Sequence, residues 1–261
     1  MKGIVGAIAG DIIGSVFENN PTKSKDFHLF VTRSCFTDDT VMTLAVAKWL
    51  CEDKDSKEVL VKNLKDFGNK YSNAGYGGRF IKWLNQDSPE AYGSWANGSA
   101  MRVSPCAWVA DSLEEAQKLA ETSAIVTHNH PEGIKGALAT SDAIYLARIG
   151  ASKDEIRDHV EVRYGYDLSV SLDEIRPGYT FDISCQGSVP ESIICFLEAK
   201  DFEDTIRNAI SLGGDADTQA AIAGSIASAY WDIPRNILYK SIYRLDYFLL
   251  NVLIDFEEKF M

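Results

Sequence analysis

Carboxylates and hydroxyls gather in two short segments that lie far apart in the chain and are otherwise apolar. The first segment, CFTDDTVMTLAVA, contains Thr37, Asp38, Asp39 and Thr40. The second segment, ISLGGDADTQAAIAGSIA, contains Asp215, Asp217 and Thr218. An unpaired carboxylate is very costly to bury, and few lysines lie near either segment to form an ion pair. Because oxygen-only donors select hard cations, the two segments indicate a site for Mg²⁺, Mn²⁺ or Ca²⁺ rather than Zn²⁺.

Helix capping is the alternative explanation for these residues. Asp and Thr are favoured at the position that begins a helix, and one such residue per helix needs no further account. Capping uses a single side-chain oxygen, however, whereas each segment offers at least three oxygen-bearing side chains. Gly213 and Gly214 also give the second segment the backbone freedom to fold around a ligand. From the residues alone, both capping and metal binding remain possible. If metals bind, two clusters would suit either one ion or two ions ~3.5–4 Å apart, and such a pair can orient a substrate and activate water.

Two known motifs with similar residues fit poorly. DADT resembles the Asp-x-Asp-x-Thr nucleophile motif of haloacid-dehalogenase-type phosphatases, but Thr218 stands one position early and Gln219 occupies the required place. Two glycines, rather than a hydrophobic strand, precede it. An EF-hand loop would need further acids and a terminal Glu, which this segment does not supply.

Other residues are candidates for the functional site, and most of them have both a functional and a purely structural interpretation. Glu18 follows GDIIGSVF and is either a solvated loop acid or a general acid/base. The segment 93–102, GSWANGSAMR, suits a nucleotide, with backbone N–H groups for phosphate and Trp95 for stacking, or is an irregular loop with a buried Trp. His128 lies in THNHP, where a third zinc ligand is missing, so we expect a ligand contact or a supporting role. Residues 76–79 either line a mouth or form a surface turn.

Helical spacing of apolar residues dominates the chain and predicts an all-α bundle. We expect helices over 40–52, 56–70, 112–126, 131–149, 152–160, 189–197, 202–212 and 217–230, and one or two within 234–260. Only 28–32 and 179–183 alternate like short strands, and we expect loops over 19–36, 71–78, 87–97 and 165–187. Helix 217–230 consists almost wholly of small residues, so we place it at the centre. No linker divides the chain, which predicts a single domain over 1–261.

Composition limits the possible functions. The chain has 261 residues with an ordinary globular balance of 46% hydrophobic and 25% charged residues. Its net charge of −12 argues against a fold-wide cationic surface and a stable nucleic-acid complex. Five widely spaced cysteines predict reduced thiols and a cytoplasmic protein. The N-terminal apolar run, interrupted at Asp11, is a poor signal peptide, and no stretch is long enough to span a membrane. Few apolar runs look exposed, which favours a monomer.

Five motifs occur together in one order: TDDT, NGSAMR, THNHP, GSVP and GGDADTQAAIAG. In this order they resemble the ADP-ribosylglycohydrolase family, which includes the dinitrogenase reductase-activating glycohydrolase and the ADP-ribosyl-acceptor hydrolases. The resemblance runs from about Gly3 to Tyr230, and the pairing of TDDT with GGDADT is its most specific part. It implies a compact, single-domain orthogonal helical bundle with a binuclear Mg²⁺ or Mn²⁺ centre in a cleft.

The resemblance also implies roles for individual residues. The metal ligands would be Thr37, Asp38, Asp39, Asp215, Asp217 and Thr218. Glu18 matches an acid proposed as catalytic in some relatives. The block that contacts the distal part of ADP-ribose would contain Gly93, Ser94, Trp95 and Asn97, with His128 near it. Some relatives have another aromatic residue and a Gly where this chain has Trp95 and Ala96, so adenosine packing would differ.

The activity implied is metal-dependent hydrolysis that removes ADP-ribose from a modified acceptor by cleaving the bond at C1″ of the distal ribose. Glu18 would be the general acid/base, with Asp39 as the alternative activator of water. The substrate would be an ADP-ribosylated protein, nucleic acid or small molecule, with no membrane involved. The alternatives are a catalytically silent ADP-ribose-binding or crystallin-like protein on the same scaffold, and a metal phosphohydrolase acting on a free nucleotide. Because the chain keeps all six expected ligands, the silent form is disfavoured.

Overall fold

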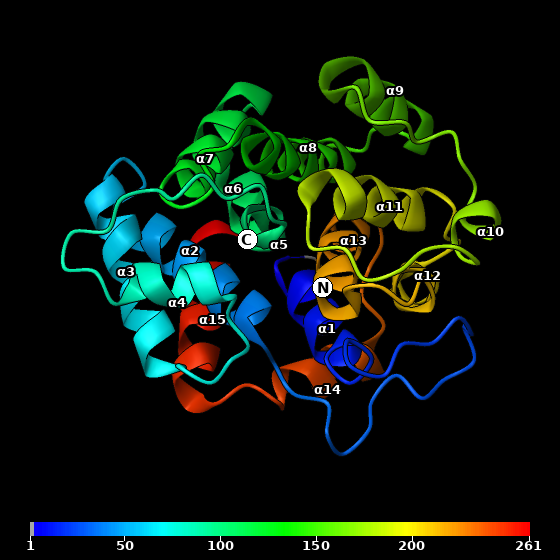
Figure 1. Ribbon diagram of the computed structural model, residues 1–261, viewed down its shortest axis with the longest axis horizontal. Helices are drawn as coiled ribbons and strands as arrows, with labels where there is room; N and C mark the ends of the chain where they lie inside the picture. The colour runs from blue at the N-terminus through cyan, green and yellow to red at the C-terminus, as the bar shows by residue number, and fades with distance from the viewer. Residues whose placement is uncertain (1–2) are drawn as a thin grey trace.

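The computed structural model describes residues 3–261, which form a helical domain (Figure 1). Within these residues the helices are α1 (Val5–Gly14), α2 (Asp38–Asp53), α3 (Lys57–Lys70), α4 (Gly78–Leu84), α5 (Gly98–Met101), α6 (Ser104–Val109), α7 (Leu113–Ile125), α8 (Pro131–Arg148), α9 (Lys153–Tyr164), α10 (Leu172–Ile175), α11 (Cys185–Leu197), α12 (Phe202–Ser211), α13 (Ala216–Tyr230), α14 (Arg235–Ile242) and α15 (Tyr247–Phe260). The described part of the chain has no extended strand, only an isolated bridge between Ala96 and Ser184. The all-α prediction is confirmed.

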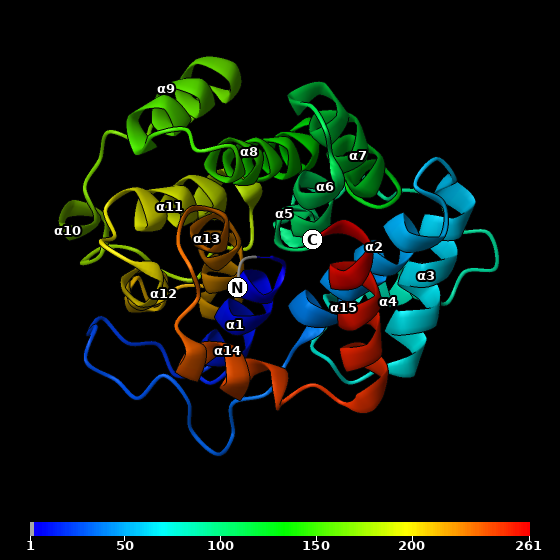
Figure 2. The ribbon, with the colours of Figure 1, turned by 180° about the vertical axis from the view of Figure 1, so that it is seen from behind.

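Helices α1 and α13 form the centre of the molecule, where Figures 1 and 2 show them side by side. Every residue of α1 is buried, and α13 is buried up to Ala229. The two backbones approach so closely that a Cβ at Gly10 would overlap the backbone of Ala220. At the end of α1, a Cβ at Gly14 would lie 2.5 Å from the Cα of Asp217. This packing therefore brings the chain that follows α1 next to the start of α13.

The other helices surround this pair. Helix α2 packs on α1, α3 and α15, and α8 packs on α7, α11 and α13. Figure 2 shows α14 at the lower side in that view and α15 beside α2, and α9 and α10 lie at the periphery. The starts of α2 and α13 carry the two acidic segments. The bundle thus fixes two sequence-distant helix N-termini near the end of α1.

Four short or unusual helical regions were missing from the sequence predictions. They are α1, α4, the pair α5 and α6, and α10. Helix α1 is apolar and glycine-rich on all sides, so it lacks the polar face that marks a surface helix. Helix α11 begins at Cys185, four residues earlier than expected, and continues through Pro190.

The two runs that alternate like short strands are not strands. Residues 28–32 have no strand partner; the carbonyls of Phe27 and Val31 accept hydrogen bonds from Arg207 and Arg244 instead. Residues 179–183 are also irregular. At their end, the Asn97 N–H donates a 2.8 Å hydrogen bond to the carbonyl of Ile183, and the Cys185 N–H donates one to the carbonyl of Trp95.

Two further observations concern the whole described chain. All five cysteines are free thiols; Cys35 is exposed, Cys51 is half-buried and the other three are buried. Among residues 3–261, no helix is both long enough and apolar enough to cross a lipid bilayer.

Candidate functional site

The two acidic segments meet at one cleft with a volume of about 360 Å³. Its lining includes Glu18 and all six expected metal ligands, namely Thr37, Asp38, Asp39, Asp215, Asp217 and Thr218. The hydroxyl of Thr218 at the start of α13 lies 3.3 Å from the carboxylate of Asp39 at the start of α2. The structure therefore brings together side chains that are separated by 179 positions in the sequence.

Capping accounts for only a small part of this arrangement. The Thr37 side chain accepts a hydrogen bond from the backbone N–H of Asp39 at 3.4 Å, which caps α2. Asp215 occupies the cap position of α13 but makes no side-chain cap bond. Its carboxylate instead accepts a 2.8 Å hydrogen bond from the amide of Asn97. The remaining acids of the cleft are not explained as helix caps.

The loop before α13 depends on its two glycines. Gly213 has φ +67°, a left-handed conformation that favours glycine. A Cβ at Gly214 would overlap the ring of Tyr179, whose hydroxyl lies 3.0 Å from the side-chain amide of Gln219. These contacts fix the turn that presents Asp215 and Asp217 to the cleft.

Asp11 supports the first acidic segment from beneath and was not among the predicted site residues. Its buried carboxylate accepts hydrogen bonds from the backbone N–H of Thr37 at 2.9 Å and of Thr40 at 3.0 Å. The hydroxyls of both threonines also donate to it. The signal in the sequence was a single acid that interrupts the apolar, glycine-rich run of α1. Such an acid needs several donors to stay buried.

Burial and crowding raise the pKa values of the cleft acids. The pKa of Asp38 is raised to about 8, first by burial and then by the charge of Asp11. Burial, followed by the charges of neighbouring carboxylates, lifts the pKa of Asp39 and of Asp217 well above the usual range. Since no Lys or Arg forms an ion pair with these acids among the described residues, their mutual repulsion is not relieved within the protein.

The donor chemistry of this cleft fits a hard divalent cation. One carboxylate oxygen of Asp39, Oδ1, is buried and has no hydrogen-bond partner. Carboxylate and hydroxyl oxygens are the ligands that Mg²⁺ and Mn²⁺ take, and a divalent charge would relieve the repulsion between the acids. Across residues 3–261, however, no three His, Cys, Asp or Glu side chains already enclose a position for an ion. The fit therefore rests on the donor types and on the unpartnered oxygen of Asp39.

Glu18 lies at the edge of the acidic cluster. It follows α1 by four residues, is half-buried and lines the cleft. Burial raises its pKa, and the charges of Asp215 and Asp11 raise it further. A carboxyl group with a raised pKa can hold a proton closer to neutral pH, as a general acid must.

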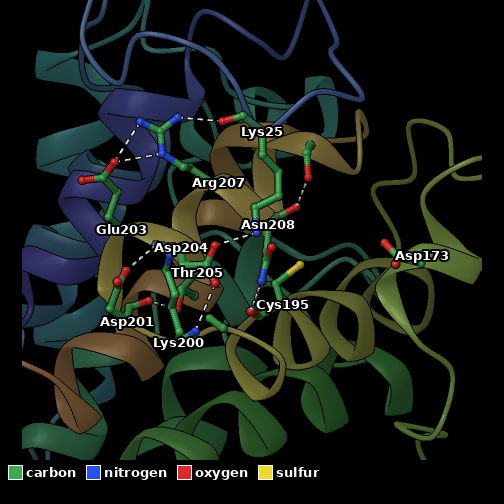
Figure 3. Close-up of polar contacts among 12 residues, drawn as sticks. Lys25, Asp173, Cys195, Lys200, Asp201, Glu203, Asp204, Thr205, Arg207 and Asn208 are labelled. Carbon is green, nitrogen blue, oxygen red and sulfur yellow. Dashed lines mark hydrogen bonds and ion pairs between the residues drawn. The ribbon is translucent and has the colours of Figure 1, made fainter.

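The segment that follows Glu18 is fastened to α12. Figure 3 shows Lys25 and Arg207 at this junction. Lys25 forms an ion pair with Asp204, and Arg207 donates to the backbone carbonyl of Lys25 at 2.7 Å. Lys23 donates to the carbonyls of Tyr179 and Leu212, close to the glycine turn before α13. These bonds hold the segment against the second acidic motif.

The predicted substrate-binding residues divide into two groups. Ser94, Asn97 and His128 line the cleft. Gly93 and Trp95 are not among the lining residues, and the Trp95 side chain is 42% exposed, so it is not a buried indole. Gly93 has φ +62° and its N–H donates to the side chain of Asn129 at 2.7 Å.

Several lining residues escaped the sequence analysis. They include Met42, Phe181 and Ile183, of which Phe181 and Ile183 are exposed. Within 76–79, the residues Gly77, Gly78 and Arg79 line the cleft, as expected if this segment forms part of its entrance. Tyr76 is buried instead. Apolar residues at a rim carry no motif, so only the fold could reveal them.

Comparisons with known proteins find distant relatives in sequence and a similar fold. A family model described as ADP-ribosylglycohydrolase matches residues 1–245. The chain is 28% identical over 304 residues to ADP-ribosylhydrolase ARH3 of Mus musculus, covering 87% of this chain and 82% of the relative. It is 26% identical over 266 residues to ADP-ribosylarginine hydrolase Tri1 of Pseudomonas putida (strain GB-1), covering 88% of this chain and 70% of the relative.

A solved structure supports the fold. A chain of an "ADP-ribosylglycohydrolase-related protein complex" superimposes with a TM-score of 0.76 and 22% sequence identity, covering 99% of this chain and 96% of the other. At this identity the likeness shows the fold alone. The family match extends over most of the chain and includes both acidic motifs. The chain therefore belongs to the ADP-ribosylglycohydrolase family.

Proposed function

We propose that this protein is a hydrolase that requires Mg²⁺ or Mn²⁺ and removes ADP-ribose from a modified acceptor. The bond cleaved would be the one at C1″ of the distal ribose. Family membership supports this proposal, since ARH3 and Tri1 are named as ADP-ribosyl hydrolases. The observation that carries it is the convergence of TDDT and GGDADT on one cleft, with a buried oxygen of Asp39 unpartnered.

Six residues would hold the two ions: Thr37, Asp38, Asp39, Asp215, Asp217 and Thr218. Bound there, divalent cations supply positive charge that neutralises the crowded carboxylates and polarises ligand oxygens. The protein prepares these ligands through two supporting contacts. Asp11 orients the first motif through Thr37 and Thr40, and Asn97 orients Asp215.

Glu18 would carry the proton transfer. Glycoside cleavage builds positive, oxocarbenium-like charge on the ribose carbon while the leaving group needs a proton. With its raised pKa, Glu18 can protonate the leaving group and then accept a proton from water. Asp39 is the alternative base, and the surrounding carboxylates favour the positive charge that develops.

The substrate would be an ADP-ribosylated protein, nucleic acid or small molecule, with the ADP-ribose half held in the cleft. Ser94, Asn97 and His128 line the cleft, and Gly93 and Trp95 flank Ser94 in the sequence. We propose a monomer that works in the cytoplasm, in keeping with five free thiols. The net charge of −12 disfavours a stable complex with nucleic acid beyond the modified end.

The test is release of free ADP-ribose, followed by chromatography, from arginine-, serine- and nucleic-acid-linked conjugates. Each conjugate is incubated with Mg²⁺ and with EDTA. We expect Mg²⁺-dependent release from at least one conjugate, which also names the acceptor. Binding of ADP-ribose without release from any conjugate would contradict the proposal and favour the silent binding protein. Release of phosphate instead of ADP-ribose would favour a phosphohydrolase.

A further inference from the structure

The cleft is lined by acidic side chains and also by basic ones, and the two groups are not paired with each other. The acids of the two motifs and Glu18 affect one another, as their pKa shifts show. The cations Arg79 and Arg102 also line the cleft, together with His128. Neither arginine forms an ion pair with a carboxylate among the described residues. One part of the cleft therefore offers positive charge that the protein leaves unbalanced.

Arg102 is a buried cation without an anionic partner. Only 1% of it is exposed, and its Nε has no hydrogen-bond partner. Burial lowers its pKa to about 10, and the groups that oppose this shift are Tyr92 and Cys106. Burial raises the pKa of both groups above their usual values, so neither is ionised at neutral pH. A buried guanidinium is costly unless a charge of opposite sign comes close.

Arg102 sets the protonation of His128 through Thr127. Its Nη2 donates to the hydroxyl of Thr127 at 2.8 Å, and this hydroxyl lies 2.7 Å from Nδ1 of His128. Thr127 is fully buried, so its hydroxyl proton needs an acceptor, and Nδ1 is the acceptor within reach. Burial, then the charges of Arg102 and Arg79, keep the pKa of His128 well below its usual value. The ring is therefore neutral, with its hydrogen on Nε2.

The Nε2–H of His128 is left as a donor at the cleft. Nε2 lies beside Gly98, where an added Cβ would be 3.1 Å away, and no hydrogen-bond partner of Nε2 occurs among the described residues. Arg79 is placed by Tyr92: its guanidinium stacks 5.0 Å from the ring centroid, and one nitrogen donates to the Tyr92 carbonyl. The Tyr92 ring in turn lies 6.0 Å from the His128 ring. Tyr92 thus stands between two donors.

We infer that Arg79 and the Nε2–H of His128, backed by the charge of Arg102, form an anion subsite that takes the diphosphate of ADP-ribose. This inference rests on the proposed function and assigns side-chain donors to one part of its substrate. Arg79 would contact the diphosphate directly and determine specificity for phosphorylated ligands. Arg102 and Thr127 would act as positioning residues. Charge-assisted hydrogen bonds of this kind are about twice as strong as neutral ones.

The first test measures binding of ADP-ribose, ADP and adenosine by calorimetry in the presence of Mg²⁺. We compare the wild type with R79A and with K82A, which removes a cation from the same helix but outside the cleft. We expect R79A to raise Kd for ADP-ribose and ADP about tenfold and to leave adenosine within about twofold, while K82A changes neither. Unchanged ADP binding by R79A, or an equal loss for adenosine, would overturn the inference.

This comparison separates the inference from the proposed function. Wild-type protein that hydrolyses a conjugate while R79A binds ADP normally would leave the proposed function intact and remove only the subsite. Wild-type protein that binds none of the three ligands would contradict both. A protein that binds ADP-ribose through Arg79 without hydrolysing any conjugate would keep the subsite and contradict the hydrolase.

The second test reads the tautomer of His128 directly from ¹⁵N NMR of the imidazole, with the signal assigned by its loss in H128Q. We expect the hydrogen on Nε2 in the wild type and in T127S, which keeps the hydroxyl. T127V should change the tautomer ratio and weaken ADP binding about fivefold, with T127S restoring both. A wild-type ring with its hydrogen on Nδ1 would overturn the relay.

Discussion

The carboxylates in and beneath the cleft have different neighbours, which decide whether each can bind a ligand. Asp11 accepts four hydrogen bonds from Thr37 and Thr40 and serves the first motif from beneath. Asp39 has an oxygen with no partner, and Asp215 is held by Asn97. The first is thus a support with its acceptors filled, whereas the other two keep acceptor capacity for a ligand.

Replacing Asp11 with Asn tests whether this residue stabilises the first motif, in contrast to an acid that lines the cleft. The amide nitrogen that replaces one carboxylate oxygen donates rather than accepts, so at least one threonine donor loses its bond to residue 11 in a buried place. We expect D11N to lower the free energy of unfolding by about 2 kcal/mol, measured by urea denaturation of metal-free protein. The matched change D38N removes a cleft acid that these threonines do not contact and should not destabilise. Equal stability of D11N and wild type would contradict the supporting role.

Glu191 in α11 should make stability depend on pH. Burial raises its pKa to about 6, Asp182 adds to the shift, and its Oε2 is buried without a partner. Between its unfolded pKa and about 6, the folded state binds a proton that the unfolded state does not, so stability falls as pH rises through this window. We expect E191Q to be more stable than wild type by about 1 kcal/mol at pH 7.5, after allowance for solvent screening, and equally stable below pH 4.

Urea denaturation at several pH values checks this prediction. E121Q removes the same charge from an exposed position of α7 and should follow the wild-type pH profile. A profile of E191Q that is parallel to the wild type over pH 4 to 8 would show that Glu191 does not titrate in this window.

At the scale of elements, the contact between α1 and α13 sets the site. Their small residues let the two backbones meet, which places Glu18 and Asp217 at the same end. The sequence identified α13 as a central helix from its small residues, and its expected start at 217 is one residue from the observed one. It did not identify α1, because a helix buried on all sides has no amphipathic pattern to detect.

Gly10 offers a direct test of this contact. A methyl group there would overlap the backbone of Ala220, which cannot move without shifting α13. We expect G10A to lower the free energy of unfolding by about 3 kcal/mol in a denaturant titration. G178A adds a methyl group where no atom lies within 4 Å and should change stability by less than about 0.5 kcal/mol. A mild effect of G10A, similar to that of G178A, would contradict close packing as the basis of the site.

Across the whole molecule, the sequence predicted the fold class, most long helices and the meeting of both acidic motifs in one cleft. These features leave local signals: helical periodicity, caps and acids in apolar surroundings. Asp11 left a signal as an acid inside an apolar run, and Arg79 and Arg102 lay within segments singled out above. Their partners, however, depend on contacts between distant segments, so the roles of these three residues could not be predicted. Trp95 was expected to contact the substrate, but it is not among the residues that line the cleft. This position depends on how the loops pack, which the sequence does not reveal.

Metal binding by the whole chain is the most direct test of the proposed centre. The measurement is calorimetric titration of metal-free protein with Mn²⁺, comparing the wild type with D215A, whose fold is checked by circular dichroism. We predict two ions bound per wild-type chain, and loss of at least one of them in D215A with the fold retained. No Mn²⁺ binding by the wild type, or two ions bound equally well by D215A, would contradict the account.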